Sequence, residues 1–466
     1  MELTSHKRHI HFVGIGGIGM SGIAEVLLTL GFPVSGSDLA ASETTERLGR
    51  LGATITLGHH ADRVGPNVDV VVISSAVKFS NPEVVRAREL KIPVIPRAEM
   101  LAELMRMKYG LAVAGTHGKT TTTSLLGHVL ADAELDPTLV IGGKVKGLDS
   151  NARLGQGKFL VAEADESDGS FLLLTPTLAI VTNIDPEHLD HYGSIERVHE
   201  AYLQFINRVP FYGLAVLCLD HVAVRALLPR VRKRFVTYGL AGDADLQAVH
   251  TRVSAHGTRF DVLERGRWIG EIQLCMPGRH NAQNALAVVA AASEVGVPFE
   301  TTARALASFE GIHRRFELKG EVGGVSVIDD YGHHPEEVKA TLRAAREGYG
   351  RRLVAVFQPH RYTRTRDLFG DFLGAFDDAD LLVLTEIYAA GEDRIEGVSG
   401  EMLYDALRRR GHADVRFVAK REQVAAALLP LLRGGDMVVT LGAGDVHRIG
   451  DDLLKALARE RPVALQ

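Results

Sequence analysis

The sequence predicts an α/β protein built from three domains. Short apolar runs alternate with longer amphipathic stretches along the whole chain, which is the pattern of strands and crossover helices in parallel sheets. Glycine occurs 48 times, and many copies follow apolar runs, where α/β folds place their ligand-binding turns. The length of 466 residues corresponds to about three domains of ordinary size.

The composition is that of an ordinary globular protein. The net charge of −5 gives no reason to expect a nucleic-acid-binding surface. Cys218 and Cys275 stand in separate apolar runs, so a disulfide framework is not expected. The polar segment 1–8 lacks the apolar core of a signal peptide, and no run of about 18 apolar residues occurs. We therefore expect a cytoplasmic protein that binds neither nucleic acid nor membrane.

The first predicted domain covers residues 1–107 and has a Rossmann-like pattern. Its elements, in order, are a strand at 9–13, a helix at 20–30, a later strand of the same sheet at 70–73 and a linking helix at 97–108. The first strand leads into a G-x-G-x-x-G turn formed by Gly14, Gly16, Gly17 and Gly19, and Asp38 lies where such folds place a ribose-binding acid. A dinucleotide and a nucleotide-sugar diphosphate satisfy this geometry equally well, and a turn without a ligand is the alternative.

The second predicted domain covers residues 108–312. Apolar runs predict strands at 111–113, 159–162, 178–181 and 215–218. A weaker alternating pattern between residues 235 and 275 suggests an antiparallel sheet, and residues 285–295 form an alanine-rich helix. The third domain, residues 313–466, is expected to be a second Rossmann-like unit, with strands at 325–328, 353–357, 381–384 and 437–440.

The sequence A-G-T-H-G-K-T-T-T follows the first strand of the second domain. Backbone N–H groups at such a turn, together with the positive end of the following helix, bind phosphate. Lys119 can neutralise the β and γ phosphates, and the Thr120 hydroxyl can hold a magnesium ion. This motif predicts a P-loop-type ATP-binding domain, with Gly115, Thr116, His117, Gly118, Lys119, Thr120 and Thr121 at the phosphates.

The loop departs from a strict Walker A motif in one position. That motif has a glycine five residues before the position of Gly118, and this chain has Val113 there. The shortened turn disfavours an ordinary P-loop kinase or GTPase and favours another kind of ATP-using enzyme.

Two acidic segments follow the next predicted strands, at the sheet edge where open α/β folds bind ligands. E-A-D-E-S-D starts at Glu163 and has four carboxylates in six residues, which repel one another unless they are solvated or bound to a cation. N-I-D-P-E-H-L-D-H places His188 between acids, and both residue types can bind a divalent metal. An exposed acidic loop and a structural histidine are the respective alternatives.

Later motifs carry amides, rings and guanidinium groups. P-G-R-H-N-A-Q-N-A enters a predicted helix with Asn281 and Asn284 on one face, although Asn281 could also serve as an N-cap. R-R-F at 314–316 and D-D-Y-G-H-H-P at 329–335 open the third domain. Q-P-H-R-Y-T-R-T-R at 358–366 offers paired planar donors for carboxylates or phosphates, with a surface basic cluster as the alternative.

Together and in this order, the motifs resemble those of the ATP-dependent Mur ligase family, which adds amino acids to the peptidoglycan precursor. The resemblance extends from Gly14 to about Asp445. G-I-G-G-I-G-M-S-G-I-A-E and D-D-Y-G-H-H-P indicate the branch that adds L-alanine. The resemblance implies ATP and Mg²⁺ as cofactors, UDP-N-acetylmuramate and L-alanine as substrates, and a monomer or weak homodimer.

The resemblance also implies a role for each candidate residue. Lys119 would stabilise the transferring phosphoryl group, and His188 would arrange magnesium together with Thr120 and Glu163. Besides the phosphate loop, the expected ATP contacts are Asn281, Asn284, Arg315 and Asp330, the last at the ribose. The UDP-sugar would bind to the Gly14–Gly19 turn and Asp38, and L-alanine would bind to Tyr331, His333, Arg361 and Arg364.

One family feature is missing from the sequence. Several Mur ligases use a carbamylated lysine shortly after the metal-binding histidine as a further magnesium ligand. No lysine lies between Lys158 and Lys233, so Glu166, Asp190 or water would have to replace it. This difference argues against the branches that add D-glutamate or a diamino acid.

Three other functions stay open at this point. A related ligase that reattaches a recycled tripeptide to the same UDP-sugar shares most of the motifs. The glycine turn alone would fit an NAD-dependent oxidoreductase, which leaves Lys119 without a role. A non-catalytic nucleotide-binding regulator would have no need of Lys119, Glu163 and His188.

Overall fold

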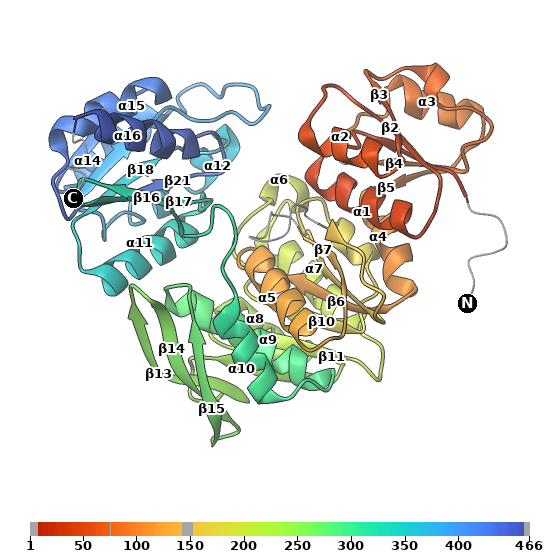
Figure 1. Cartoon of the computed structure of the whole chain (residues 1–466), viewed down its shortest axis with the longest axis horizontal. Helices are drawn as coiled ribbons and strands as arrows, with labels where there is room; N and C mark the ends of the chain where they lie inside the picture. Colours follow the sequence, from red (N-terminus) through yellow and green to blue (C-terminus); the bar gives the residue numbers. More distant parts are fainter. Residues whose placement is uncertain (1–7, 75, 142–151, 461–466) are drawn as a thin grey trace. The chain divides into compact units, whose positions relative to one another are not determined.

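A computed structural model describes residues 8–74, 76–141 and 152–460, apart from the side chains of Ile18 and Asp190. Three separate sheets, each flanked by helices, confirm the three-domain α/β architecture (Figure 1). Contacts group the chain into two compact units: the first holds residues 1–249, 261–272 and 283–309, and the second holds residues 250–260, 273–282 and 310–466. The domain boundaries after residues 107 and 312 stay a prediction.

The first sheet is fully parallel, with the strand order β3-β2-β1-β4-β5. Its strands are β1 (Ile10–Val13), β2 (Val34–Asp38), β3 (Thr54–Leu57), β4 (Val70–Ile73) and β5 (Val94–Pro96). The helical segments are α1 (Ile18–Thr29), α2 (Glu43–Arg50), η1 (Ala61–Arg63), α3 (Pro82–Glu89) and α4 (Arg97–Arg106). The strand order reverses beside β1, which is where open α/β sheets bind ligands. The four elements predicted for this domain are confirmed.

A buried polar network joins β1, β2, the segment after β3 and α3. The Glu83 carboxylate, which is fully buried, accepts hydrogen bonds from Ser37 Oγ at 2.6 Å and from the backbone N–H of His60 at 3.1 Å. His11 Nε2 lies 3.3 Å from the same carboxylate. Burial alone would raise the pKa of Glu83, but the hydrogen bonds from His11 and Ser37 outweigh it and hold that pKa below its ordinary value.

The depressed pKa of Glu83 predicts that this domain loses stability in acid. The ionised carboxylate contributes stability that is fully present above its unfolded-state pKa of about 4.3 and is lost as the pH falls through the lower folded-state pKa. Glu83→Gln is expected to cost about 2 kcal/mol at pH 7 and to flatten the acid dependence. Hydrogen exchange of peptides from β1 and α3, followed from pH 7 to pH 3, measures both effects. Equal protection in the two proteins at pH 7, with the same acid slope, would contradict this account.

The second sheet has ten strands in the order β15-β14-β13-β12-β11-β10-β6-β9-β7-β8. The strands from the centre to one edge are β6 (Tyr109–Ala114), β9 (Phe159–Glu163), β7 (Thr138–Val140) and β8 (Ala152–Arg153). Toward the other edge they are β10 (Leu178–Val181), β11 (Leu214–Cys218), β12 (Phe235–Gly239), β13 (Leu246–Ser254), β14 (Gly257–Glu264) and β15 (Arg267–Leu274). The helical segments are α5 (Lys119–Asp132), η2 (Ser170–Leu173), α6 (Leu189–Tyr192), α7 (Ile195–Asn207), α8 (Val222–Leu227), η3 (Leu228–Arg230), α9 (Arg279–Glu294) and α10 (Phe299–Ser308).

The antiparallel sheet predicted between residues 235 and 275 is only partly correct. β12 pairs in parallel with β11 on one side and with β13 on the other. β13, β14 and β15 are joined by two-residue turns and therefore run antiparallel, as hairpins do. Buried and exposed residues alternate along β14 and β15, so the sequence pattern was informative there. The alternating sequence pattern did not indicate that β12 belongs to the parallel part of the sheet.

The third sheet has the order β16-β17-β21-β18-β19-β20 and is parallel except for the β16–β17 pair. Its strands are β16 (Glu317–Val322), β17 (Val325–Asp330), β18 (Leu353–Phe357), β19 (Leu381–Leu384), β20 (Val415–Phe417) and β21 (Met437–Leu441). The helical segments are α11 (Pro335–Tyr349), α12 (Tyr362–Asp367), α13 (Phe369–Phe372), α14 (Gly400–Arg410), α15 (Arg421–Leu428), η4 (Leu429–Leu431) and α16 (His447–Glu460). Apolar clusters cover both faces of the sheet, and all four strands predicted for this domain are confirmed.

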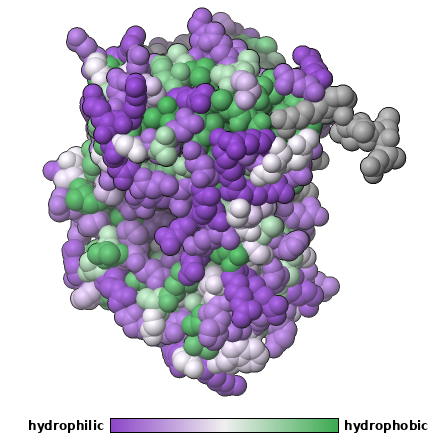
Figure 2. Space-filling model, turned by 90° about the vertical axis from the view of Figure 1, so that its left-hand side faces the viewer, coloured by the Kyte–Doolittle hydropathy of each residue, from purple (hydrophilic) through white to green (hydrophobic). Residues whose placement is uncertain are grey.

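The surface view in Figure 2 shows a largely hydrophilic face on which hydrophobic residues gather in limited patches. Among the residues that the structure describes, no helix has both the length and the apolar character needed to cross a membrane.

Candidate active site

The phosphate loop lies between β6 and α5, as predicted. Gly115 and Gly118 have φ angles of +141° and +80°, which side-chain-bearing residues rarely adopt. A Cβ at Gly118 would lie 2.7 Å from Asn284 Oδ1, and one at Gly115 would collide with the Thr182 hydroxyl. Helix α5 starts without a capping side chain. The loop therefore requires glycine at both positions and presents a helix N-terminus suited to phosphate.

Lys119 is folded back over this loop and paired with a carboxylate. Its Nζ donates to the Thr116 carbonyl at 3.2 Å and to Glu166 Oε1 at 2.9 Å. The Lys119 and Glu166 side chains are only 17% and 4% exposed, so water screens this ion pair weakly. Burial alone would lower the pKa of Lys119, but the carboxylates of Glu166 and Asp165 outweigh it and raise that pKa above its ordinary value. Lys119 is therefore a fixed positive charge beside the helix N-terminus.

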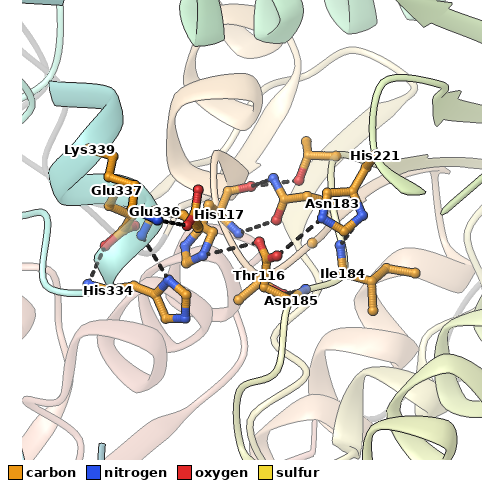
Figure 3. Close-up of polar contacts among 12 residues, drawn as sticks. Thr116, His117, Asn183, Ile184, Asp185, His221, His334, Glu336, Glu337 and Lys339 are labelled. Atoms are coloured by element: carbon orange, nitrogen blue, oxygen red, sulfur yellow. Dashed lines mark hydrogen bonds and ion pairs between the residues drawn. The ribbon is translucent and has the colours of Figure 1, made fainter. Parts of the chain in front are cut away.

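Residues at the end of β10 hold the loop in place (Figure 3). The Asn183 side chain accepts from the His117 backbone N–H at 2.7 Å and donates to the His117 carbonyl at 3.1 Å. The backbone N–H of Asp185 donates to Thr116 Oγ1 at 2.8 Å. The conformation of the loop is thus determined by the neighbouring strand as well as by its own glycines.

Three ligand-type side chains meet close to Lys119. Glu166, Glu187 and His188 each offer one atom, and these atoms lie within 4.8 Å of one another. His188 has a φ of +56°, which is uncommon outside glycine and is often retained at functional sites. Two carboxylates and one imidazole are a donor set that suits a divalent cation.

This cluster overlaps only in part with the predicted metal ligands. The cluster contains His188, which was predicted as a ligand. Its other two members are Glu166 and Glu187, whereas the predicted ligands were Glu163 and Thr120. Glu163 ends β9 and Thr120 is the second residue of α5, so both stay predicted ligands from neighbouring elements. Glu166 was considered as a replacement for the missing lysine, whereas the side chain of Asp190 lies outside the described part of the structure.

The two predicted nucleotide-binding amides of α9 have different surroundings. Asn284 lies against Gly118 of the phosphate loop, so closely that a side chain at Gly118 would meet its amide oxygen. Asn281 donates from Nδ2 to the Pro277 carbonyl at 2.8 Å and is 6% exposed. The structure therefore gives Asn281 a role in the turn that starts the helix, and its contact with a nucleotide stays a prediction.

The glycine turn of the first sheet is closed by the predicted ribose-binding acid. Gly16 donates its N–H to Asp38 Oδ2 at 2.8 Å, and Leu39 donates to Oδ1 at 2.8 Å. Gly14 has a φ of +78°, and a Cβ on Gly19 would collide with the guanidinium of Arg97. The turn lies at the amino end of α1 and is suited to a diphosphate.

In the second unit, Asp330 ends β17 and is buried by its own turn. Its carboxylate accepts from the backbone N–H groups of Phe316 and Gly332, both at 2.8 Å, and from Thr341 Oγ1 at 3.2 Å. Burial raises the pKa of Asp330 to about 6, against the attraction of Arg315. These contacts serve the turn, and the expected contact of Asp330 with ribose stays a prediction.

Tyr331, His333 and Arg364 of the predicted amino-acid pocket belong to one group of side chains. The rings of Tyr331 and His333 lie 5.4 Å apart, and the Arg314 and Arg315 guanidinium groups lie 4.9 and 5.4 Å from the Tyr331 ring. Arg364 lies 3.2 Å from His360 Nδ1, and the His360 ring is 5.6 Å from that of His333. Arg361 instead faces Glu392 at 3.9 Å.

Several members of these groups were missed in the sequence. His360 stands inside the Q-P-H-R-Y segment, so its neighbours could have indicated it. Tyr388, whose ring stacks on His360 at 5.6 Å, and Glu392 come from a later loop with no recognisable local motif. Glu187 and Asp185 lie within the N-I-D-P-E-H segment, but only the fold shows which of its acids face the loop.

The chain belongs to the Mur ligase family. Models of three family domains match consecutive parts of it: the Mur ligase catalytic domain over residues 9–109, the middle domain over 113–292 and the glutamate ligase domain over 314–444. These matches cover the three sheets, the phosphate loop and the cation cluster.

Relatives with assigned names point to one member of this family. A UDP-N-acetylmuramate–L-alanine ligase from Myxococcus xanthus is 59% identical over 99% of this chain and 97% of its own. The crystal structure of a UDP-N-acetylmuramate–alanine ligase from Thermotoga maritima has a TM-score of 0.81 at 32% identity and covers 98% of this chain and 100% of its own. A murein peptide ligase from Psychrobacter arcticus has a TM-score of 0.69 at 26% identity, over 98% and 100% of the two chains.

Proposed function

We propose that the protein joins L-alanine to the lactyl carboxylate of UDP-N-acetylmuramate, with cleavage of ATP to ADP and phosphate, in the synthesis of the peptidoglycan precursor. The observation that carries this proposal is the shortened phosphate loop with Lys119 and an acidic cation cluster beside it, in a chain 59% identical to a ligase of that name. A carboxylate and an amine do not condense favourably in water, so the carboxylate must first be activated.

In the first step, a lactyl carboxylate oxygen attacks the γ-phosphorus of ATP. The bond to the ADP oxygen breaks, and an acyl phosphate forms. Positioning and neutralisation of charge account for most of the catalysis of such a transfer. Lys119 would bind the transferring phosphoryl group, while the N–H groups from Gly115 to Thr121 hold the phosphates. Asn284, beside Gly118, would contact the nucleotide.

Glu166, Glu187 and His188 fit a divalent cation, which we propose to be Mg²⁺, with Thr120 and Glu163 as further ligands. When bound, Mg²⁺ would neutralise the charge that develops on the phosphate oxygens. Lys119 Nζ donates to Glu166 Oε1 at 2.9 Å, and burial raises the pKa of Glu166 to about 7, so we propose that Glu166 changes partner when phosphates bind to Lys119.

In the second step, the amine of L-alanine attacks the acyl carbon. The tetrahedral intermediate collapses to the amide as the C–O bond to the phosphoryl group breaks; phosphate leaves with one oxygen of the original carboxylate, and the proton lost by the amine balances as HPO₄²⁻. We propose that Tyr331, His333 and Arg364 form part of the alanine pocket, together with His360, and that Arg361 contributes a second guanidinium group. The Gly14–Gly19 turn and Asp38 would hold the UDP portion.

A comparison of amine substrates tests this function against the tripeptide-recycling alternative. Phosphate release is measured with ATP, Mg²⁺ and UDP-N-acetylmuramate, and with L-alanine, glycine, L-serine or an alanyl tripeptide as the amine. We expect L-alanine to give a kcat/KM at least tenfold above that of the tripeptide, a difference of about 1.4 kcal/mol in the transition state. A preference for the tripeptide would make the protein a recycling ligase. Tight NAD binding with no response to the UDP-sugar would support an oxidoreductase instead.

A further inference from the structure

His221 lies outside every motif that the sequence indicated, yet it lies beside the phosphate loop. It directly precedes α8 and is the third residue after β11. Because β6, β10 and β11 are parallel neighbours, their carboxyl ends share one edge of the sheet. The phosphate loop follows β6, the Asn183–Asp185 segment follows β10, and His221 follows β11. His221 is thus two strands away from the loop that starts at Gly115.

The contacts of His221 lead to that loop through Asp185 (Figure 3). His221 Nδ1 accepts from the backbone N–H of Ile184 at 3.4 Å, and its Nε2 lies 3.2 Å from Asp185 Oδ1. An accepting Nδ1 places the proton on Nε2, so Nε2 is the donor to Asp185. The His221 and Asp185 side chains are 25% and 19% exposed.

Asp185 also contacts two residues of the phosphate loop, His117 and Thr116. Its Oδ2 lies 3.4 Å from His117 Nε2, and its backbone N–H donates to Thr116 Oγ1 at 2.8 Å. One carboxylate therefore lies between two imidazoles, with one oxygen facing each. The Oδ1 atom of this carboxylate contacts His221, which follows a different strand from the one that Asp185 follows.

The neighbour of His221 is anchored firmly. The Asp220 carboxylate accepts from the backbone N–H of Leu240 at 2.6 Å, from that of Ala241 at 2.8 Å and from Gln283 Nε2 at 2.6 Å. Three contacts to two other segments fix the backbone just before His221. The imidazole is consequently held on a rigid support, as a positioning residue requires.

We propose that His221 is a positioning residue for the phosphate loop: through Asp185 it orients His117 and Thr116, and with them the N–H groups that bind the ATP phosphates. The inference rests on the proposed ATP-binding function and adds a residue to it. Loss of the His221–Asp185 contact should weaken ATP binding, because the loop would sample orientations in which its donors do not converge. It should leave the chemical step and UDP-sugar binding nearly unchanged.

Two amide variants separate positioning from a general effect on folding. The amide nitrogen of glutamine reaches the place of His Nε2, whereas the shorter asparagine reaches only that of Nδ1. His221→Gln should therefore keep the donor to Asp185, and His221→Asn should lose it. Asparagine is also a favoured N-cap, so His221→Asn does not weaken the start of α8. His128→Ala is the matched control, because His128 is on α5 but contacts Ser308 instead, at 3.0 Å.

The experiment measures the Kd for Mg²⁺-ATP by calorimetry and the KM and kcat for each substrate. We expect His221→Asn to raise the Kd and KM for ATP about fivefold with kcat within about twofold, and His221→Gln and His128→Ala to stay within about twofold of the parent. In an Asp185→Ala background, His221→Asn should have no further effect. Unchanged ATP affinity in His221→Asn, equal losses in the Asn and Gln variants, or independent losses in the double variant would each overturn the proposal. Parent protein that binds ATP but does not ligate L-alanine would refute the proposed function alone.

Discussion

Lys119→Ala is expected to lower kcat/KM by about 1,000-fold or more, which corresponds to about 4 kcal/mol of transition-state stabilisation. Lys119 is the charged side chain held directly over the phosphate loop, and its surroundings keep it protonated. The loop from Gly115 to Thr121 contains no other lysine or arginine that could replace it. The effect should appear in kcat, because charge develops on the phosphoryl group mainly in the transition state. Steady-state phosphate release measures it.

Two controls separate this loss of catalysis from a loss of folding. The variant leaves Glu166 buried without its cation, which costs about 3 kcal/mol of stability. Adding Glu166→Gln should restore the melting temperature but not the activity. Lys158→Ala, which removes an exposed lysine, should match the parent in both. Activity of Lys119→Ala within tenfold of the parent would show that the loop assignment is wrong.

His188→Ala is expected to lower kcat about 100-fold and to raise the Mg²⁺ concentration needed for half-maximal activity. His188 combines a backbone in the left-handed region with membership of the cation cluster. Removing the imidazole leaves Glu166 and Glu187 as the only members of the cluster. With one ligand fewer, we expect the cation to bind more weakly, and the two carboxylates to repel each other when it is absent. A magnesium titration of phosphate release measures both parameters.

The matched control for this variant is His191→Ala. His191 is an exposed histidine three residues further along the same segment and is not part of the cation cluster. The His191→Ala variant should need the same Mg²⁺ concentration for half-maximal activity as the parent. If His188→Ala and His191→Ala had identical magnesium curves, the cluster formed by Glu166, Glu187 and His188 would not be the cation site.

Local motifs explain why much of the fold and the loop could be predicted. A buried strand followed by G-T-H-G-K-T has few structural solutions, because Gly115 and Gly118 tolerate backbone angles that other residues avoid. The apolar runs of the third domain are buried strands for a similarly local reason. Hydrophobic periodicity reports burial directly, so these elements did not depend on distant residues.

Long-range pairing explains what the sequence did not reveal. Glu166 is one of four carboxylates in its segment, and only the fold shows that it meets Lys119. His221 reaches the loop because β10 and β11 are neighbours, which no spacing in the sequence records. Tyr388 stacks on His360 from a separate loop. Such contacts are set by strand order, and strand order is a property of the whole sheet.

Oxygen transfer from the carboxylate to phosphate tests the central claim most directly. UDP-N-acetylmuramate labelled with ¹⁸O in both lactyl carboxylate oxygens is incubated with ATP, Mg²⁺, L-alanine and the protein, and the released phosphate is analysed by mass spectrometry. Activation through an acyl phosphate predicts one ¹⁸O atom in each phosphate formed. Unlabelled phosphate, formed at the same rate as the amide, would contradict the account.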